Sequence, residues 1–287
     1  MAERENTIKQ LTSYFEKRDD IVMAFVFGSQ ATGRAHSGSD WDIAVYFTLS
    51  SDELEYEETD RDYPEEHTVW TDCIRILETD NVDLIILNRA PATIAAAAIR
   101  GTPLVIKDRQ LWLRFMLVIT GVAEDYRIFA RDYYEIFQRS KSLSADDADR
   151  LGRIITFLES QTELYSYFIR YTRDQYLNDI HKRLEVERWV ENIMNACIDS
   201  AKIVVASSRE ATPQAYREII AQGALLVGLT EEVTLQLEKW VRLRNVLAHE
   251  YLDIKWKRIS DFAQTSELYI KQFVEAAKQF LEREMSE

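Results

Sequence analysis

The sequence predicts an α+β domain followed by an all-α helical domain. In the first 137 residues, short apolar runs typical of buried strands alternate with helical patterns, whereas beyond residue 144 almost every segment has helical spacing. The 287 residues suffice for two modest domains, and a hydrophobic content of 46% allows sizeable cores. Only 8 Gly and 4 Pro favour long regular elements, mostly helices.

The first domain is expected to contain four strands and four helices. The predicted strands span residues 22–27, 43–47, 82–87 and 104–106, and the predicted helices span 7–18, 69–78, 92–99 and 111–137. The composition turns polar at 139–149, where we place the domain boundary. Ser144 with Asp147 indicates a helix start in which Asp replaces the usual Glu of a capping box.

The second domain is expected to consist of helices, with Gly223 and Gly228 in a turn. The predicted helices span residues 151–170, 183–205, 213–221, 231–251 and 260–284. The sequence contains no internal repeat. The two cysteines, Cys73 and Cys197, are far apart and match no metal-ligand pattern, so we expect two buried small hydrophobic side chains.

The segment 26–47 carries the strongest chemical signal. Gly28-Ser29 ends the first apolar run, and Asp40-x-Asp42 precedes the second. Alternation places Asp40 and Asp42 on one face of an extended segment, where Mg2+ can hold carboxylates and phosphates together. Gly28 lets the backbone approach a ligand, and Ser29 offers a hydroxyl and an N–H to phosphate. The pattern predicts metal-assisted chemistry on a nucleoside triphosphate.

This arrangement resembles the nucleotidyltransferase superfamily, whose signature is Gly-Ser, about ten residues, then Asp-x-Asp. The segment G-S-Q-A-T-G-R-A-x-x-x-S-D-W-D looks most like the corresponding segment of minimal nucleotidyltransferases of the MntA antitoxin type. The resemblance implies a small mixed sheet with helices, ATP as substrate and Mg2+ as cofactor. It also implies a third catalytic carboxylate on a following strand. The resemblance assigns that role to Asp83. Without the resemblance, an Asp at the start of a strand would be interpreted as a surface residue or a cap.

A second pattern, R-L-R-N-V-L-A-H-E-Y, ends the predicted helix 231–251. At about 100° per residue, Asn245 and His249 share a face, while Arg244 and Tyr251 lie on another face about 140° from the histidine. An imidazole can move protons in RNA cleavage, and a guanidinium can stabilise charge on the phosphorane. Alternatively, these side chains cap the helix and cover the core.

The spacing of Arg244, His249 and Tyr251 resembles the motif of HEPN ribonucleases of the HepT toxin type, with Asn245 in support. The segment 187–201 is similar to the second helix of that family. The resemblance implies that the antitoxin transfers AMP from ATP to Tyr251 and silences a metal-independent ribonuclease. The chain therefore looks like both partners fused, with an MntA-like domain at about 1–138 and a HEPN domain at about 144–287.

Two other functions fit parts of the sequence. An aminoglycoside-type nucleotidyltransferase also combines this catalytic fold with a helical substrate or dimerisation domain, and its cationic substrate would suit the acidic stretch 50–66. We otherwise expect that stretch to be a solvated loop rather than a source of extra metal ligands. A regulatory nucleotide-binding module without catalysis is the third possibility, which the intact carboxylates disfavour.

The charge and the helical domain bear on partners and location. A formal net charge of −14 disfavours broad nucleic-acid binding. RNA would need a local basic patch, for which the candidates are Lys239, Arg242, Lys255, Lys257 and Arg258; ordinary helix-end charges explain them equally well. We found no signal or membrane-spanning segment, so we expect a cytoplasmic protein.

We also expect a homodimer through the HEPN domain. A single histidine can fill only one proton-transfer role at a time, and a two-fold interface would bring two copies of the motif to one cleft. The resemblance implies such a dimer too. The helices also carry many large apolar side chains, namely Trp189, Phe262, Tyr269 and Phe273, which fill the core if they do not form an interface.

Overall fold

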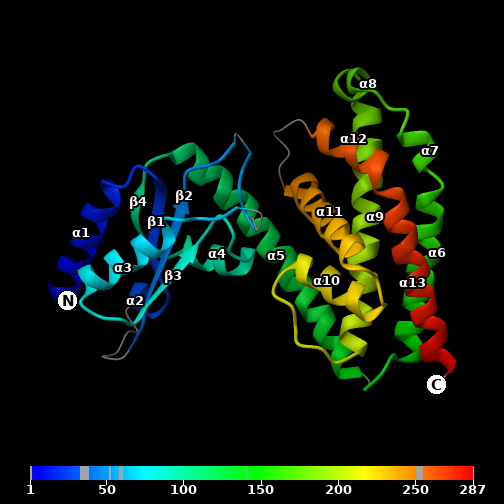
Figure 1. Cartoon of the computed structure of the whole chain (residues 1–287), viewed down its shortest axis with the longest axis horizontal. Coiled ribbons are helices and arrows are strands. Elements are labelled where there is room, and N and C mark those ends of the chain that lie inside the picture. Colours follow the sequence, from blue (N-terminus) through cyan, green and yellow to red (C-terminus); the bar gives the residue numbers. More distant parts are fainter. Residues whose placement is uncertain are drawn as a thin grey trace. The chain divides into compact units, whose positions relative to one another are not determined.

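The computed structural model describes residues 2–32, 39–51, 53–57, 61–139, 141–249 and 255–286. The chain divides into two compact units, Met1–Asp125 and Tyr126–Glu287 (Figure 1). The first combines a sheet with helices, and the described part of the second is helical. This confirms the predicted order of an α+β domain followed by an all-α domain.

Among the described residues, the first unit contains a mixed four-stranded sheet in the order β3-β2-β1-β4. Strand β1 is antiparallel to both β2 and β4, and β2 is parallel to β3. The strands are β1 (Ile21–Phe27), β2 (Trp41–Phe47), β3 (Val82–Ile86) and β4 (Thr102–Ile106). The helices that begin in this unit are α1 (Ala2–Glu16), α2 (Gly28–Thr32), α3 (Glu66–Leu77), α4 (Ala92–Ala98) and α5 (Arg109–Arg139).

The two faces of this sheet are covered by different helices. Helices α1 and α3 share one core with Ile43, Val45 and Phe47 of β2. On the opposite face, the ring of Tyr46 packs edge-on against Phe115 of α5, with centroids 4.9 Å apart. Alternation along β2 then assigns Asp42 to the same face as Tyr46, away from the core under α1 and α3.

The second unit is a helical bundle around α9, which packs against α6, α10 and α11 (Figure 1). Its helices are α6 (Ala145–Thr162), α7 (Tyr165–Phe168), α8 (Arg173–Asn178), α9 (Ile180–Ser207), α10 (Tyr216–Leu226), α11 (Glu231–His249), α12 (Trp256–Thr265) and α13 (Glu267–Ser286). The predicted start of α6 is confirmed, because Ser144 is its N-cap and its side chain accepts a hydrogen bond from the Asp147 N–H.

Helix α5 contributes to both units, which differs from the predicted boundary at 139–149. Four of its residues, Tyr126, Phe129, Tyr133 and Ile136, belong to the core of the second unit. The division therefore falls inside α5, between Asp125 and Tyr126. The helical pattern at 111–137 does not reveal this division. Its apolar residues keep the same spacing throughout, although they pack in one unit before Tyr126 and in the other from Tyr126 onward.

Two predicted helices are divided in the structure. The predicted helix 151–170 ends at Thr162, where the Trp189 indole donates to the Gln161 carbonyl at 3.1 Å. The predicted helix 260–284 is divided at the buried Ser266, whose hydroxyl donates to the Phe262 carbonyl at 2.7 Å. The Ser266 N–H donates to the same carbonyl at 3.0 Å.

Gly223 lies inside α10 and not in the predicted turn. A Cβ at this position would lie 2.7 Å from the Cβ of Ala201 on α9, so the glycine permits close packing of the two helices. Gly228, with φ of +81°, follows the helix and does form a turn, because its N–H donates to the Leu225 carbonyl.

The acidic stretch 50–66 is solvated in part, as its composition predicts, since Glu53, Asp62 and Glu65 are exposed. Glu55 is only 3% exposed and binds Arg61 at 2.7 Å and the Asn88 amide at 2.8 Å. Burial alone would raise the pKa of Glu55, but hydrogen bonds from Ser50, Asn88 and Arg61 lower it below its usual value. This carboxylate anchors the described part of the loop beside the end of β2.

Two smaller expectations can be compared with the structure. The thiols of Cys73 and Cys197 are both buried, as predicted. None of the described helices has the length and the apolar content that crossing a bilayer would require.

Candidate functional site

Two of the three predicted carboxylates lie side by side in the sheet. Asp42 of β2 and Asp83 of β3 are direct partners in the parallel ladder. Neighbouring strands are about 4.8 Å apart, and partners in register point to the same face. That face is the one opposite α1 and α3, because Val82 and Ile86, which alternate with Asp83, are in the core with those helices.

Gly28 lies directly against this carboxylate pair. A Cβ on Gly28 would lie 2.0 Å from Oδ2 of Asp42, and the glycine has a φ of +67°. For both reasons, any residue other than glycine would strain the backbone or clash with Asp42 at this position. Gly28 and Ser29 open the short helix α2, so the predicted turn begins as a helical turn. The fold therefore brings the Gly-Ser pair to Asp42, as the spacing in the sequence indicates.

Asp40 lies immediately before β2 and is exposed. The preceding residue, Ser39, accepts a hydrogen bond from the side chain of Gln30 at 3.2 Å. Gln30 is only 8% exposed and belongs to α2. Its amide thus ties the backbone before Asp40 to the Gly-Ser helix. The sequence signature contains Gln30 but gives it no role.

The surroundings of Asp42 disfavour its negative charge. Burial raises the pKa of Asp42, and the charges of Asp83 and Asp40 raise it further. Ionising Asp42 therefore costs more in the folded protein than in the unfolded chain, and a bound cation would offset that cost.

The residues suit a magnesium ion whose remaining ligands come from a substrate. Within the described ranges, no group of three or more His, Cys, Asp and Glu side chains is arranged to hold a metal alone. Mg2+ is commonly bound through one or two carboxylates together with substrate phosphates and water. Asp42 and Asp83 supply such a pair, with Asp40 nearby, so the donor set suits Mg2+ on a triphosphate.

The second predicted site centres on Arg244 of α11, whose guanidinium is held from three helices. Its Nε donates to Oδ1 of Asn195 on α9 at 2.7 Å, and its Nη1 donates to Oδ1 of Asn245 at 3.2 Å. The guanidinium carbon also lies over the ring of Tyr216 on α10, 5.2 Å from its centroid. Neither Asn195 nor Tyr216 was predicted, because both come from other helices.

The structure describes the other motif residues only as far as His249. Asn245 is buried, 1% exposed, and orients Arg244 through its own side chain. His249 is the last described residue of α11 and is partly exposed. Tyr251, the predicted AMP acceptor, lies outside the described residues.

The predicted basic patch is smaller than its sequence suggests. Lys239 pairs with Asp261 at 2.7 Å, and Lys255 is only 7% exposed. Lys255 is therefore part of the packing, whereas Lys239 is exposed beside its partner. Lys257 is also exposed, and Arg242 and Arg258 are partly exposed, so these four remain candidates for an RNA contact.

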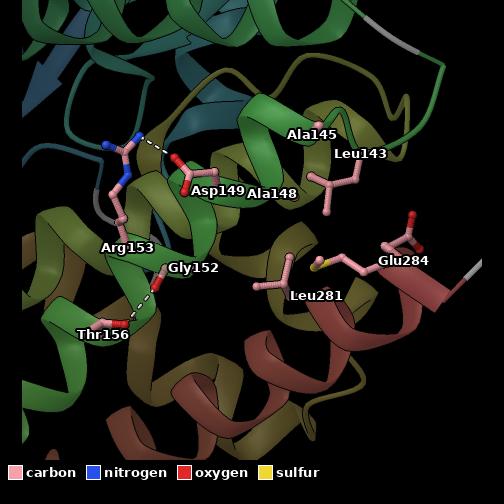
Figure 2. A pocket seen from close by; sticks show the side chains of 10 residues that line it. Leu143, Ala145, Ala148, Asp149, Gly152, Arg153, Thr156, Leu281 and Glu284 are labelled. Carbon is pink, nitrogen blue, oxygen red and sulfur yellow. Dashed lines mark hydrogen bonds and ion pairs between the residues drawn. The ribbon is translucent and has the colours of Figure 1, made fainter.

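A separate hollow lies between the start of α6 and the end of α13 (Figure 2). Its volume is about 810 Å³, and its apolar lining includes Leu143 and Leu281. On its rim Arg153 pairs with Asp149 at 2.9 Å. None of the predicted site residues lines it.

Two family models match separate parts of the chain. The model described as "Polymerase beta, Nucleotidyltransferase" matches residues 9–110. The model described as "Ribonuclease HepT-like" matches residues 157–277. The first range includes Gly28, Asp42 and Asp83, and the second includes Arg244 and His249. No curated protein matches the chain.

Two solved structures are similar to part of the chain. One is described as "Crystal structure of the toxin-antitoxin with AMP-PNP"; it has 20% identity and a TM-score of 0.39, and covers 44% of this chain and 96% of its own. The other is a tri-AMPylated Shewanella oneidensis HEPN toxin in complex with MNT antitoxin. It has 20% identity and a TM-score of 0.40, and covers 45% of this chain and 96% of its own. TM-scores this low carry no structural or functional conclusion.

The two family models agree in order and position with the sheet-containing unit and the helical unit. The chain therefore carries a polymerase β-type nucleotidyltransferase domain followed by a HepT-like HEPN domain.

Proposed function

We propose that the N-terminal domain is an MntA-type antitoxin that transfers AMP from ATP to Tyr251 and thereby silences the ribonuclease of the HEPN domain. One observation carries the transferase half: Asp42 and Asp83 are register partners, with Gly28 against Asp42. The HepT-like match, which includes Arg244 and His249, supports the ribonuclease half. Both ATP and RNA are cytoplasmic, in keeping with the predicted location.

The transferase residues divide the work between binding and proton transfer. Bound Mg2+ would neutralise charge on the triphosphate and orient it for displacement. Asp40, Asp42 and Asp83 would hold the cation, and Gly28 and Ser29 would bind phosphate oxygens. The Tyr251 oxygen attacks the α-phosphorus, and the bond from that phosphorus to the bridging oxygen breaks. Pyrophosphate leaves, and Asp83 accepts the phenol proton.

In the proposed ribonuclease, His249 transfers protons and Arg244 stabilises negative charge. His249 would take the proton of the 2′-hydroxyl or protonate the leaving oxygen. Arg244 would stabilise the charge on the phosphorane. AMP on Tyr251 would add bulk and negative charge two residues from His249, and would repel an RNA phosphate. Because donor and acceptor share one chain, transfer also benefits from a raised effective concentration.

We further propose that two HEPN domains form the active ribonuclease. The four large residues that suggested an interface do not support it, because Trp189, Phe262 and Phe273 are in the core and Tyr269 packs against it. Support comes instead from exposed side chains on the first turns of α9, where Ile180 and Leu184 are each 57% exposed.

Sedimentation equilibrium at micromolar concentration tests the dimer. We expect twice the 33.6 kDa of one chain for the native protein, and one chain for the double variant Ile180→Glu/Leu184→Glu. The matched control is Leu225→Glu/Leu268→Glu, which places the same two charges on other exposed positions, 75% and 61% exposed. A native mass near 33.6 kDa would exclude a shared cleft.

Intact-mass spectrometry after incubation with ATP and Mg2+ tests the transfer. We expect a gain of one or more AMP units, located on Tyr251 by peptide mapping, and no gain in Asp42→Ala or Tyr251→Phe. Before incubation, the protein should cleave RNA in the presence of a chelator, and His249→Ala should not. Modification of an added aminoglycoside without self-modification would contradict the proposal.

The alternative functions have less support. The HepT-like match includes the Arg244 motif, which the aminoglycoside alternative treats as chance. Glu55, in the acidic stretch, is bound to Arg61 and Asn88 and is not available to a cationic substrate. A module without catalysis would not need Gly28 against Asp42 and a pair of carboxylates in register.

A further inference from the structure

We propose that Tyr216 is a positioning residue for Arg244 and that the C-terminal half of α5 holds it in place. The inference rests on the proposed ribonuclease function for its catalytic meaning, but its geometry is independent of that function. It adds α5, which precedes the HepT-like range 157–277, to the machinery that orients the guanidinium.

The ring of Tyr216 supports the Arg244 guanidinium from one face, in addition to hydrogen bonds in the plane of the group. Asn195 and Asn245 accept hydrogen bonds from Nε and Nη1. These two bonds lie in the plane of the guanidinium, and a ring against its face resists tilting out of that plane. The ring of Tyr216, 5.2 Å from the guanidinium carbon, supports it from one face. The ring is 5% exposed, which strengthens a cation–π contact by excluding water.

Tyr216 is in turn enclosed by two rings of α5. Its ring meets those of Phe129 at 5.0 Å and Tyr126 at 5.6 Å, both edge-on. The Tyr126 hydroxyl donates to the carbonyl of Pro213, shortly before α10 begins. Both rings are less than 10% exposed. Movement of this part of α5 therefore displaces the Tyr216 ring, and with it the support under Arg244.

This chain of contacts gives α5 a role beyond packing. Tyr126 and Phe129 lie in the part of α5 that belongs to the HEPN unit, so the position of Arg244 depends on side chains that precede the HepT-like range. Asn195 is the second positioning residue, because it fixes the Nε edge that the ring does not reach.

Hydrogen exchange of the Arg244 Nε–H in the full-length protein tests the proposal. The resonance is observed by NMR with ¹⁵N-arginine and assigned by its loss in Arg244→Lys. In the native protein, the bond to Asn195 should slow this exchange. Losing a desolvated cation–π contact should speed exchange roughly tenfold in Tyr216→Leu, whereas Tyr216→Phe, which keeps the ring, should match the native protein.

Variants of α5 separate positioning from stability. Phe129→Leu should also speed exchange at Arg244. The matched control is Tyr133→Leu, which removes an equally buried α5 ring that packs on Phe137 and bonds to the Glu210 carbonyl. Thermal melts of all variants identify general loosening. Native exchange rates in both Tyr216→Leu and Phe129→Leu, or equal acceleration by Tyr133→Leu, would overturn the proposal.

RNA cleavage by the same variants distinguishes this proposal from the proposed function. If both hold, Tyr216→Leu should lower kcat with little change in KM, because Arg244 acts on charge that develops in the transition state. Altered exchange at Arg244 with no cleavage by the native protein would leave the positioning role intact and refute the ribonuclease.

Discussion

The two candidate sites are assembled in different ways. The carboxylate site is built by backbone pairing, since β2 and β3 place Asp42 beside Asp83 and Gly28 follows the strand next to them. The Arg244 site is built by side chains from α9, α10 and α11, with a second layer from α5. Strand register is fixed rigidly by backbone hydrogen bonds, whereas helix packing depends on many side chains at once.

This difference predicts different sensitivities. The carboxylate site should fail through substitutions that move a single carboxylate by an ångström. The Arg244 site should fail through the loss of packing far from the motif in the sequence. Three predictions test this contrast.

The largest effect is expected from removing α5 from the HEPN unit. A fragment of residues 144–287 follows the predicted boundary but lacks four core side chains of α5, namely Tyr126, Phe129, Tyr133 and Ile136. Burying each is worth about 1.5–3 kcal/mol, so the loss exceeds about 5 kcal/mol, comparable with the total stability of a small domain. Urea denaturation followed by circular dichroism should show a cooperative transition for residues 109–287 and none for 144–287. Equal midpoints would show that α5 is dispensable.

An intermediate effect is expected for Gly28→Ala in the carboxylate site. The added Cβ would meet Oδ2 of Asp42, and displacing a reacting group by about 1 Å can cost roughly a hundredfold in rate. The rate of AMP transfer, measured by mass spectrometry, should fall accordingly. Gly228→Ala is the matched control, because Gly228 also has a positive φ but no atom lies within 4 Å of its added Cβ. It should lose stability and keep its transfer rate; a comparable fall in rate would point to backbone strain as the cause.

The smallest effect concerns the charge of Asp42. Because its pKa is raised in the folded protein, folding takes up a proton as the pH rises above 3.8, and ionisation of Asp42 lowers stability at neutral pH. Asp42→Asn should therefore stabilise the metal-free protein at pH 7, by at most about 1 kcal/mol since solvent screens the site. The gain should vanish below pH 3.8, where the carboxyl is protonated in both states. Thermal melts across this range would detect it, and a destabilised variant at pH 7 would contradict the assigned repulsion.

Binding of Mg2+ and a nucleotide sharpens the same experiment. A ligand that binds only the folded state raises its stability, so both together should raise the melting temperature of the native protein. The rise should be smaller in Asp42→Asn, which has lost one ligand. The difference in melting temperature between Asp42→Asn and the native protein should therefore shrink or change sign when the ligands are added.

Much of the carboxylate site follows from the sequence, because its parts lie near strand ends. Alternation within β2 and the apolar run of β3 locate Asp42 and Asp83, and Gly28 follows β1 directly. The predicted strands and most predicted helices are present for the same reason: the periodicity of apolar residues is a local property. The pairing of β2 with β3 is not local, and the family resemblance implied only that the third carboxylate lies on a following strand.

The sequence by itself determined the types of the two domains, the positions of most elements and the motif residues Arg244 and His249. Only the tertiary structure decided what surrounds the motif: Asn195 is 49 residues from Arg244 along the chain, and Tyr216 is on another helix. It also decided that Glu55 is buried and that α5 serves both cores. Periodicity shows which face of a helix is apolar, but the partner of that face is set by packing among distant segments.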